Sequence, residues 1–427
     1  MASVSAAAAT AEPAAAAPTL VPLHRDPRFR RFWVGQTISV LGDQVSALAI
    51  PLTAVLALHA SALQVGVLAS LAWLPHLLFS LPAGVWIDRR PHRRVNMILA
   101  DFGRAAALAT VAVTWWLGAL TIWQLLAVAF AVGALTVFFD LSYSQFFVAL
   151  VRREQFVDAN SKLSTSRSVS YIAGPSIAGF LVQAFSAPVA LLGDAFSFVG
   201  SALALRGIDV VEPEIGPRGP VRRDLADGFR FVRHQPLLRA GVLCTSTINF
   251  FNFLLFAIFV LYASRTLGLS PATIGIVLGT ASIGALAGAL IAPRIGRRIG
   301  IGRAVVVGSV LFPAPMALFP LAHGPHWLSA SMLLVGEFFA SVGVMLFDVN
   351  QNALMAMVTP NEIRSRVVGV TRFFNYGVRP IGALLGGVLG AAIGLRPTLW
   401  ISVLGCLLGV FFLLASPMTQ TREEDLL

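Results

Sequence analysis

The chain has 427 residues, of which 57% are hydrophobic and 12% charged, and its mean hydropathy is +0.79. Soluble globular proteins carry about 25% charged residues, so this composition excludes a soluble globule and indicates a protein that crosses a bilayer several times. The net charge of +11 does not indicate a nucleic-acid partner, because most arginines gather in alternate connections between apolar runs.

Twelve apolar runs are long enough to cross a membrane, since one helical span needs roughly 20 residues. With the amino terminus in the cytoplasm, nearly all arginines outside the runs fall in cytoplasmic connections. This bias predicts a multi-pass membrane protein with both termini cytoplasmic. The predicted spans are residues 32–57, 64–86, 96–117, 122–147, 164–185, 188–206, 238–263, 272–293, 303–322, 327–348, 366–393 and 397–415.

The first predicted span carries a carboxylate, Asp43, about 11 residues from its start and therefore roughly 16 Å deep. An ionised acid at that depth costs about 2.5 kcal/mol or more unless it faces a cavity or a partner. We expect Asp43 to line a central cavity, and a structural hydrogen bond between helices is the alternative.

A short, densely charged turn from Gly84 to Arg94 separates the second and third spans. A weaker copy runs from Gly288 to Arg298, and in both copies an arginine lies nine residues after the glycine. A charged turn that recurs once per half predicts an all-α membrane protein with twelve transmembrane helices in two pseudo-symmetric six-helix bundles. The residues expected to form a cytoplasmic gate at these turns are Gly84, Asp88, Arg89, Arg93 and Arg297.

The duplication predicts how the chain is divided. Prolines interrupt the apolar pattern between the halves, and the segment that follows, Arg222 to Arg233, has an amphipathic pattern that predicts an interfacial helix. The expected segments are a disordered cytoplasmic tail (1–29), an N-terminal bundle (30–206), a cytoplasmic linker with that helix (207–237), a C-terminal bundle (238–415) and a cytoplasmic tail (416–427).

The third span contains Asp101 and Arg104, whose i, i+3 spacing places both on one face of a helix. We expect them to pair with each other or with Asp43, and contact of Arg104 with the cavity stays open. Asp140 and Asp348 recur near the inner ends of the fourth and tenth spans. We expect these two aspartates to complete the gate through salt bridges with arginines of the charged turns, and substrate contact is the alternative.

The fifth and eleventh spans combine proline with small residues. Proline removes a backbone hydrogen bond and bends a helix, whereas glycine permits close helix contact. Gly174, Pro175, Gly179 and Pro380 are therefore expected to form surfaces on which the bundles rock. Generic packing of small residues is the alternative.

Polar residues in the second half complete the predicted interior. The repeat places Asn252 opposite Asp43, with Asn249 one turn away, while Glu337 lies roughly 15 Å deep and Arg379 lies within the eleventh span. We expect Asp43 and Glu337 to face one cavity from opposite bundles, where burial favours the protonated acid. The residues expected to serve proton coupling and substrate contact are Asp43, Arg104, Asn249, Asn252, Glu337 and Arg379.

Several motifs carry a family resemblance. The turn Gly84-Val-Trp-Ile-Asp88-Arg89, followed by arginines, resembles the loop between the second and third spans of the major facilitator superfamily. Gly174-Pro175-x-x-x-Gly179 is similar to the antiporter signature of its proton-coupled drug exporters. Other runs look like the branch that contains macrolide-efflux and enterobactin-exporter proteins, namely residues 151–154, 158–160, 193–198 and 395–397.

This resemblance implies a secondary active transporter that exports amphipathic small molecules, such as drugs, macrolides or siderophore-like compounds. It implies alternating access by a monomer in the lipid bilayer, driven by protons and without a cofactor. A facilitator, an importer or a lysolipid flippase of the same fold is the alternative within transport.

A membrane enzyme or scaffold is the remaining alternative. The chain has no Gly-x-x-x-x-Gly-Lys-Ser/Thr run for ATP. Cys244 and Cys406 fall in different spans and the histidines are scattered, so neither a metal site nor a catalytic constellation is predicted.

Overall fold

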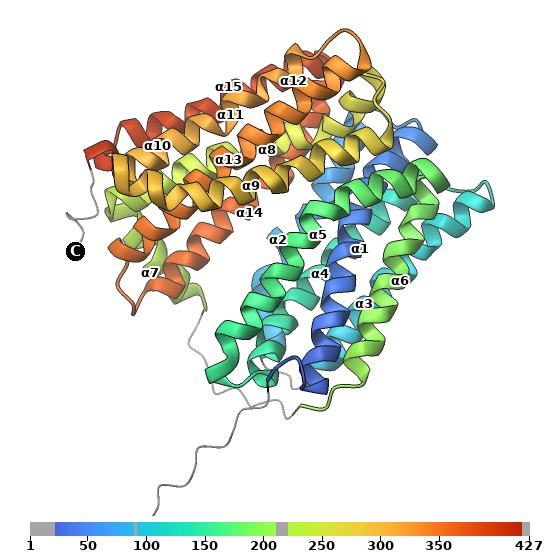
Figure 1. Ribbon diagram of the computed structural model, residues 1–427, viewed down its shortest axis with the longest axis horizontal. Coiled ribbons are helices and arrows are strands. Elements are labelled where there is room, and N and C mark those ends of the chain that lie inside the picture. The colour runs from blue at the N-terminus through green and yellow to red at the C-terminus, as the bar shows by residue number, and fades with distance from the viewer. Residues whose placement is uncertain (1–21, 89–91, 211–220, 421–427) are drawn as a thin grey trace, which may run out of the picture.

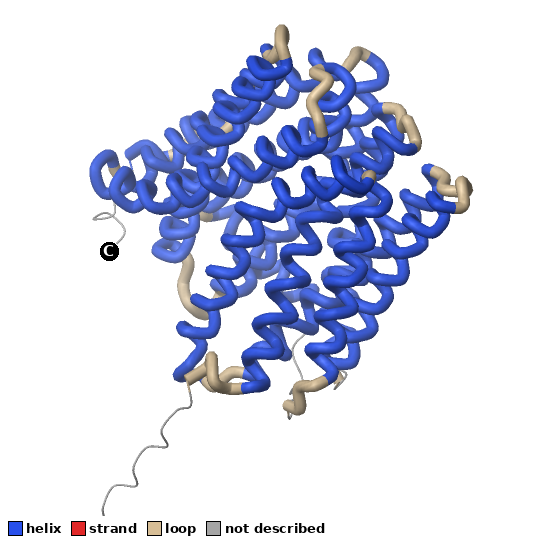
Figure 2. Tube along the Cα trace, turned by 45° about the vertical axis from the view of Figure 1, so that its right-hand side comes forward, coloured by secondary structure: helices blue, strands red, loops and turns tan. Residues whose placement is uncertain are grey.

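A computed structural model describes residues 22–88, 92–210 and 221–420, and in these ranges the chain is helical without a strand (Figures 1 and 2). The N-terminal bundle consists of α1 (Pro27–Leu52), α2 (Ala62–Asp88), α3 (Arg93–Trp116), α4 (Ile122–Leu150), α5 (Phe156–Phe185) and α6 (Ala187–Arg206). The C-terminal bundle consists of α8 (Pro236–Leu261), α9 (Pro271–Ile299), α10 (Ile301–Leu311), α11 (Pro313–Met316), α12 (Leu318–Leu321), α13 (His326–Val358), α14 (Arg364–Ala392) and α15 (Leu395–Leu414).

The predicted twelve-span, two-bundle layout is confirmed. Among the described residues, 11 helical stretches are long and apolar enough to cross a membrane. The remaining span is α14, which is less apolar because it carries four arginines, Arg364, Arg366, Arg372 and Arg379. The ninth span is divided into α10, α11 and α12, because its prolines cannot donate backbone hydrogen bonds within a helix.

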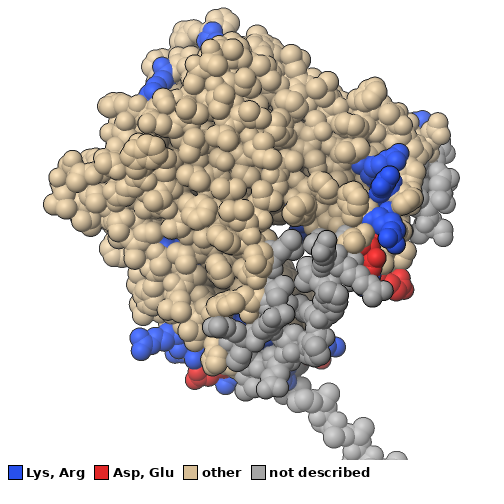
Figure 3. All heavy atoms as spheres, turned by 180° about the vertical axis from the view of Figure 1, so that it is seen from behind, with Lys and Arg blue, Asp and Glu red and all other residues tan. Residues whose placement is uncertain are grey.

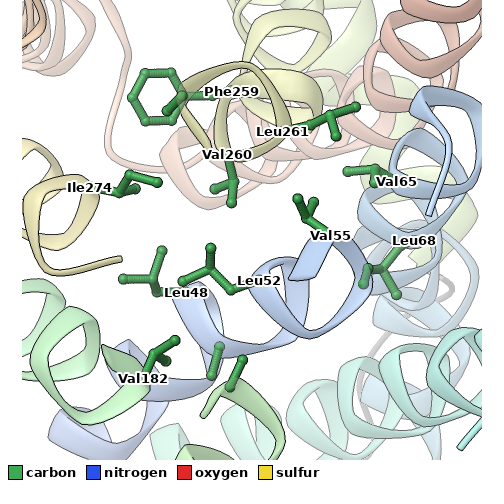
Figure 4. Packing of buried hydrophobic residues seen from close by; sticks show 14 of the residues in the cluster. Leu48, Leu52, Val55, Val65, Leu68, Val182, Phe259, Val260, Leu261 and Ile274 are labelled. Carbon is green, nitrogen blue, oxygen red and sulfur yellow. The ribbon is translucent and has the colours of Figure 1, made fainter. Parts of the chain in front are cut away.

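The two bundles converge at one end and splay apart at the other, where α1 begins and α7 lies (Figure 1). At the closed end a single buried apolar cluster joins side chains of both halves. Figure 4 shows residues of α1, of the π-helical segment after it (Thr53–Ala57), of α2 and of α5 facing residues of α8 and α9. Labelled members are Leu48, Leu52, Val55, Val65, Leu68, Val182, Phe259, Val260, Leu261 and Ile274.

Glycines bring the bundles into backbone contact at this closed end. A Cβ atom built on Gly66 of α2 would lie 2.4 Å from the Cα atom of Gly387 on α14. On α9, a Cβ atom on Gly275 would lie 2.3 Å from the backbone oxygen of Pro175 on α5. Neither position admits a side chain while the bundles are in this arrangement, so α2 with α14 and α5 with α9 form the two tight seams.

The linker helix α7 (Val221–His234) packs on the C-terminal bundle. Asp227 forms an ion pair of 3.1 Å with Arg366 of α14, and the rings of Phe229 and Phe374 stack with centroids 6.2 Å apart. Val232 is buried among apolar residues of α8 and α14. The helix is therefore held by protein contacts along one face, which its amphipathic pattern alone did not specify.

Charged side chains lie mostly at the two ends of the molecule. Seen from behind, Lys and Arg mark both ends, while the broad surface between them carries few charges (Figure 3). A nearly uncharged middle band is the surface that a protein needs against the hydrocarbon core of a bilayer.

Candidate functional site

An ion pair is buried inside the N-terminal bundle. Asp101 and Arg104 of α3 pair with each other, as predicted, with side chains only 0% and 2% exposed. The guanidinium lies over the rings of Phe139 and Phe198, 4.5 Å and 4.0 Å from their centroids. Aromatic faces favour a cation, so Arg104 is neutralised and enclosed by its own bundle.

Two further acids, Asp194 and Asp43, lie beside this ion pair. Asp194 of α6 is fully buried and accepts hydrogen bonds from the hydroxyl groups of Ser46 and Ser197. Gly42 makes room for it, because a Cβ atom there would lie 2.3 Å from the Asp194 Oδ1 atom. The next residue, Asp43, is half-buried, and among the described residues its carboxyl group has neither an ion pair nor a hydrogen bond.

In the N-terminal bundle the charges of Asp43, Asp101, Asp194 and Arg104 act on one another, and those of Asp43 and Arg104 also act on Asp140 of α4. Several carboxyl groups thus interact with one guanidinium. Sequence reasoning placed Asp194 in a family motif and as a secondary candidate for coupling, but did not predict its position beside Asp43. The available signal was its location within an apolar span together with Ser197 one turn away.

The buried Asp101–Arg104 pair is expected to contribute to the free energy of unfolding. Replacing Arg104 with methionine should lower the free energy of unfolding by about 3–5 kcal/mol, because it leaves a buried carboxylate without its partner. The double replacement Asp101→Asn with Arg104→Met should recover much of that loss. Unfolding by SDS titration in mixed micelles measures both values, and a double variant no more stable than Arg104→Met would contradict the pairing argument.

The C-terminal bundle leaves its interior acid uncompensated. Glu337 of α13 lines a cavity of about 230 Å³, and among the described residues it forms no ion pair and no hydrogen bond. Helices α8 to α13 build the whole wall of this cavity, whose lining is Asn252, Leu255, Phe256, Phe259, Leu278, Phe312, Met316, Phe319, Glu337, Ala340, Ser341 and Val344.

Asp43 is not part of this wall, which corrects the expectation that Asp43 and Glu337 face one cavity from opposite bundles. The reason is the direction of Glu337, which faces a cavity lined by α8, α9 and the short helices α11 and α12 of its own bundle. Each acid therefore has its own surroundings, polar and partly compensated around Asp43, apolar and aromatic around Glu337.

A neighbouring cavity of about 210 Å³ brings together Asp348 and Arg379 with Asn249, Asn252 and Asn375. It shares Asn252 with the Glu337 cavity. Asp348 thus lines an interior cavity, and no salt bridge to an arginine is present in the described part of the chain. Its predicted gate role is not tested by this arrangement and stays a prediction.

Arg379 lies in an aromatic cage that spans both bundles. Its guanidinium is 4.3 Å from the Tyr376 ring centroid, 4.9 Å from that of Phe253 and 4.7 Å from that of Trp73. Trp73 comes from α2, whereas the other two rings come from α14 and α8. The predicted cavity residue therefore connects the bundles by cation–π contacts, and sequence reasoning did not identify the cage.

Two of the remaining gate residues lie at helix ends, since a buried Arg93 begins α3 and an exposed Arg297 lies in the last turn of α9. Asp140 instead lies within α4, where the charges of Arg104 and Asp43 act on it. The backbone of α2 ends at Asp88, whose side chain, like all of Arg89, lies outside the described residues. Gly84 has open space where a Cβ atom would be, so no described residue packs closely against it here.

The predicted rocking residues lie on tight contacts. A Cβ atom on Gly179 would lie 2.4 Å from the backbone oxygen of Pro271 on α9, which places Gly179 in the seam between the bundles. Gly174 instead packs on Gln44 of α1, within its own bundle. Helices α5 and α14 continue through Pro175 and Pro380, and both prolines are buried.

No group of three or more His, Cys, Asp or Glu side chains within the described ranges is arranged to hold a metal ion. Cys244 and Cys406 are buried thiols in α8 and α15.

Known proteins match this chain over almost its whole length. A family model described as "Transmembrane secretion effector" matches residues 17–427. The "Multidrug efflux pump Tap" of Mycolicibacterium fortuitum is 29% identical over 419 residues, covering 90% of this chain and 94% of that protein. The "Macrolide efflux protein A" of Streptococcus pyogenes is 23% identical over 405 residues, covering 93% and 98%.

Two solved structures of a bacterial homologue of the iron transporter ferroportin, in an inward-facing and an outward-facing state, share this fold. Its inward-facing state has a TM-score of 0.74 at 17% identity, covering 92% of this chain and 98% of that one. Its outward-facing state has a TM-score of 0.54 at 18% identity, covering 90% and 98%.

Proposed function

The chain belongs to the transmembrane secretion effector family, and from that premise we propose that it is a proton-coupled exporter of amphipathic small molecules. It works by alternating access as a monomer in the bacterial plasma membrane, with both termini cytoplasmic and with the proton gradient in place of a cofactor. The names of two relatives, a multidrug pump and a macrolide pump, support export of such compounds.

The observation that carries the proposal is the imbalance of charge inside the bundles. Asp43, Asp194 and Glu337 lie within the spans and form no ion pair among the described residues, whereas the guanidinium of Arg104 is already engaged by Asp101. Each ionised acid at that depth costs several kcal/mol, so each requires either a proton or a cationic ligand. Alternation between these two states is a basis for exchange.

The arrangement of the bundles supports alternating access. The splayed end bears the start of α1 and the linker helix, and the arginine bias of the sequence predicts that this end is cytoplasmic. The greater likeness to the inward-facing than to the outward-facing state of one transporter supports the same direction. Closure there would bring together Asp140, Asp348 and the arginines of the charged turns, which we propose as the gate.

Inverted membrane vesicles with an acidified lumen and an internal pH dye test this proposal. Ethidium, tetraphenylphosphonium, erythromycin and chloramphenicol are added in turn, and at least one is expected to alkalinise the lumen because its entry drives protons out. Vesicles with the double replacement Asp43→Asn and Glu337→Gln are expected to give no response. If wild-type vesicles respond to none of the compounds but move lysolipid between leaflets, the flippase alternative replaces the exporter.

A further inference from the structure

We propose that the Glu337 cavity inside the C-terminal bundle is a binding site for organic cations that carry an aromatic or apolar body. This inference rests on the proposed export function and names a substrate class for it. In this proposal the C-terminal bundle recognises the charge of the substrate, and the acids around Asp43 in the N-terminal bundle do not take part in that recognition.

The carboxyl group of Glu337 needs a partner from outside the chain. It is half-buried at the wall of a cavity, and none of the described side chains donates a hydrogen bond or a positive charge to it. In the N-terminal bundle, the buried carboxylate of Asp101 has such a partner within the chain, the guanidinium of Arg104. A positively charged ligand would supply the missing charge at Glu337.

The rest of the cavity fits the apolar body of such a ligand. Four phenylalanines, Phe256, Phe259, Phe312 and Phe319, and one methionine surround the single carboxylate. Aromatic faces stabilise an organic cation, and they do so more strongly where the cation is desolvated. Asn252 and Ser341 add two polar groups that orient a ligand without adding charge.

The volume of the Glu337 cavity limits which part of a ligand can enter it. A cavity of about 230 Å³ admits one substituted ring with its ammonium group. It shares Asn252, Phe312 and Val344 with the cavity of about 210 Å³ at Asp348 and Arg379. A larger molecule therefore has room to place its cationic end at Glu337 and extend toward Arg379.

Fluorescence anisotropy of ethidium with the purified full-length protein in detergent tests the site. Glu337→Gln should weaken ethidium binding at least tenfold, and Glu337→Asp should recover part of the affinity because it keeps the charge. Ser341→Leu should weaken binding independently of charge by filling the cavity. Glu362→Gln is the matched control, since Glu362 is exposed in the turn between α13 and α14.

Glu337→Gln protein that melts like the wild type and still binds ethidium with wild-type affinity would overturn the inference. Wild-type protein that binds no ethidium, yet exchanges another compound for protons in the vesicle assay, would overturn it as well and leave the proposed function intact. Wild-type vesicles that show no proton movement with any compound would instead contradict the proposed function.

Discussion

Replacing Gly387 with leucine is expected to abolish transport, with a fall of at least a hundredfold in the initial rate. A Cβ atom at Gly387 would lie 2.6 Å from the Cα atom of Gly66 across the seam between α14 and α2. A leucine side chain would hold the two bundles apart at the closed end, because packed backbones cannot yield by that amount. The cycle would then lose the state in which this end is sealed.

Spin-label distances across the closed end and the initial rate of substrate export both measure this effect. Gly369→Leu is the matched control, because Gly369 lies on the same helix α14 but has open space where its Cβ atom would be. Gly387→Leu protein with wild-type distances and wild-type rates would show that the seam does not need to close.

Neutralising Asp43 with asparagine is expected to abolish proton-driven exchange, again by at least a hundredfold, while substrate counterflow continues. Asp43 is the half-buried acid of the N-terminal group, whereas Asp101 and Asp194 are completely buried. A proton reaching this group therefore meets Asp43 before Asp101 or Asp194, and Asp194 lies deeper, hydrogen-bonded to Ser46 and Ser197. Loss of Asp43 would remove the proton step but leave the substrate cavity of the other bundle intact.

Proteoliposomes measure both quantities, with counterflow at equal pH and exchange under an imposed pH gradient. Asp158→Asn serves as the control, because Asp158 is an exposed acid that pairs with Lys162 on the surface of α5. If Asp43→Asn protein exchanges protons for substrate at the wild-type rate, the coupling acid lies elsewhere, and Asp194→Asn becomes the next variant to measure.

The spans, their number and the duplication were predictable because they depend on local composition. Twenty apolar residues make a span wherever they occur, and a repeated charged turn marks the repeated half. Pairing of Asp101 with Arg104 was predictable for the same reason, since both residues lie on one face of a single helix.

Contacts between distant helices were not predictable from a single sequence. Depth along a helix places Glu337 and Asp43 at the same level, but the rotation of α13 in its bundle decides which cavity Glu337 enters. The cage around Arg379 likewise needs rings from three helices, including Trp73 of the opposite bundle. The number of aromatic residues in the spans does not predict which rings come into contact with Arg379.

Uphill transport in proteoliposomes shows most directly whether proton entry drives substrate export. A compound identified in the vesicle assay is placed on both sides at equal concentration, and the lumen is then made acid. We expect the compound to accumulate in the lumen, the accumulation to collapse when nigericin removes the pH gradient, and no accumulation with Asp43→Asn protein. Equilibration of the compound at equal concentrations, with or without the pH gradient, would contradict proton-driven export.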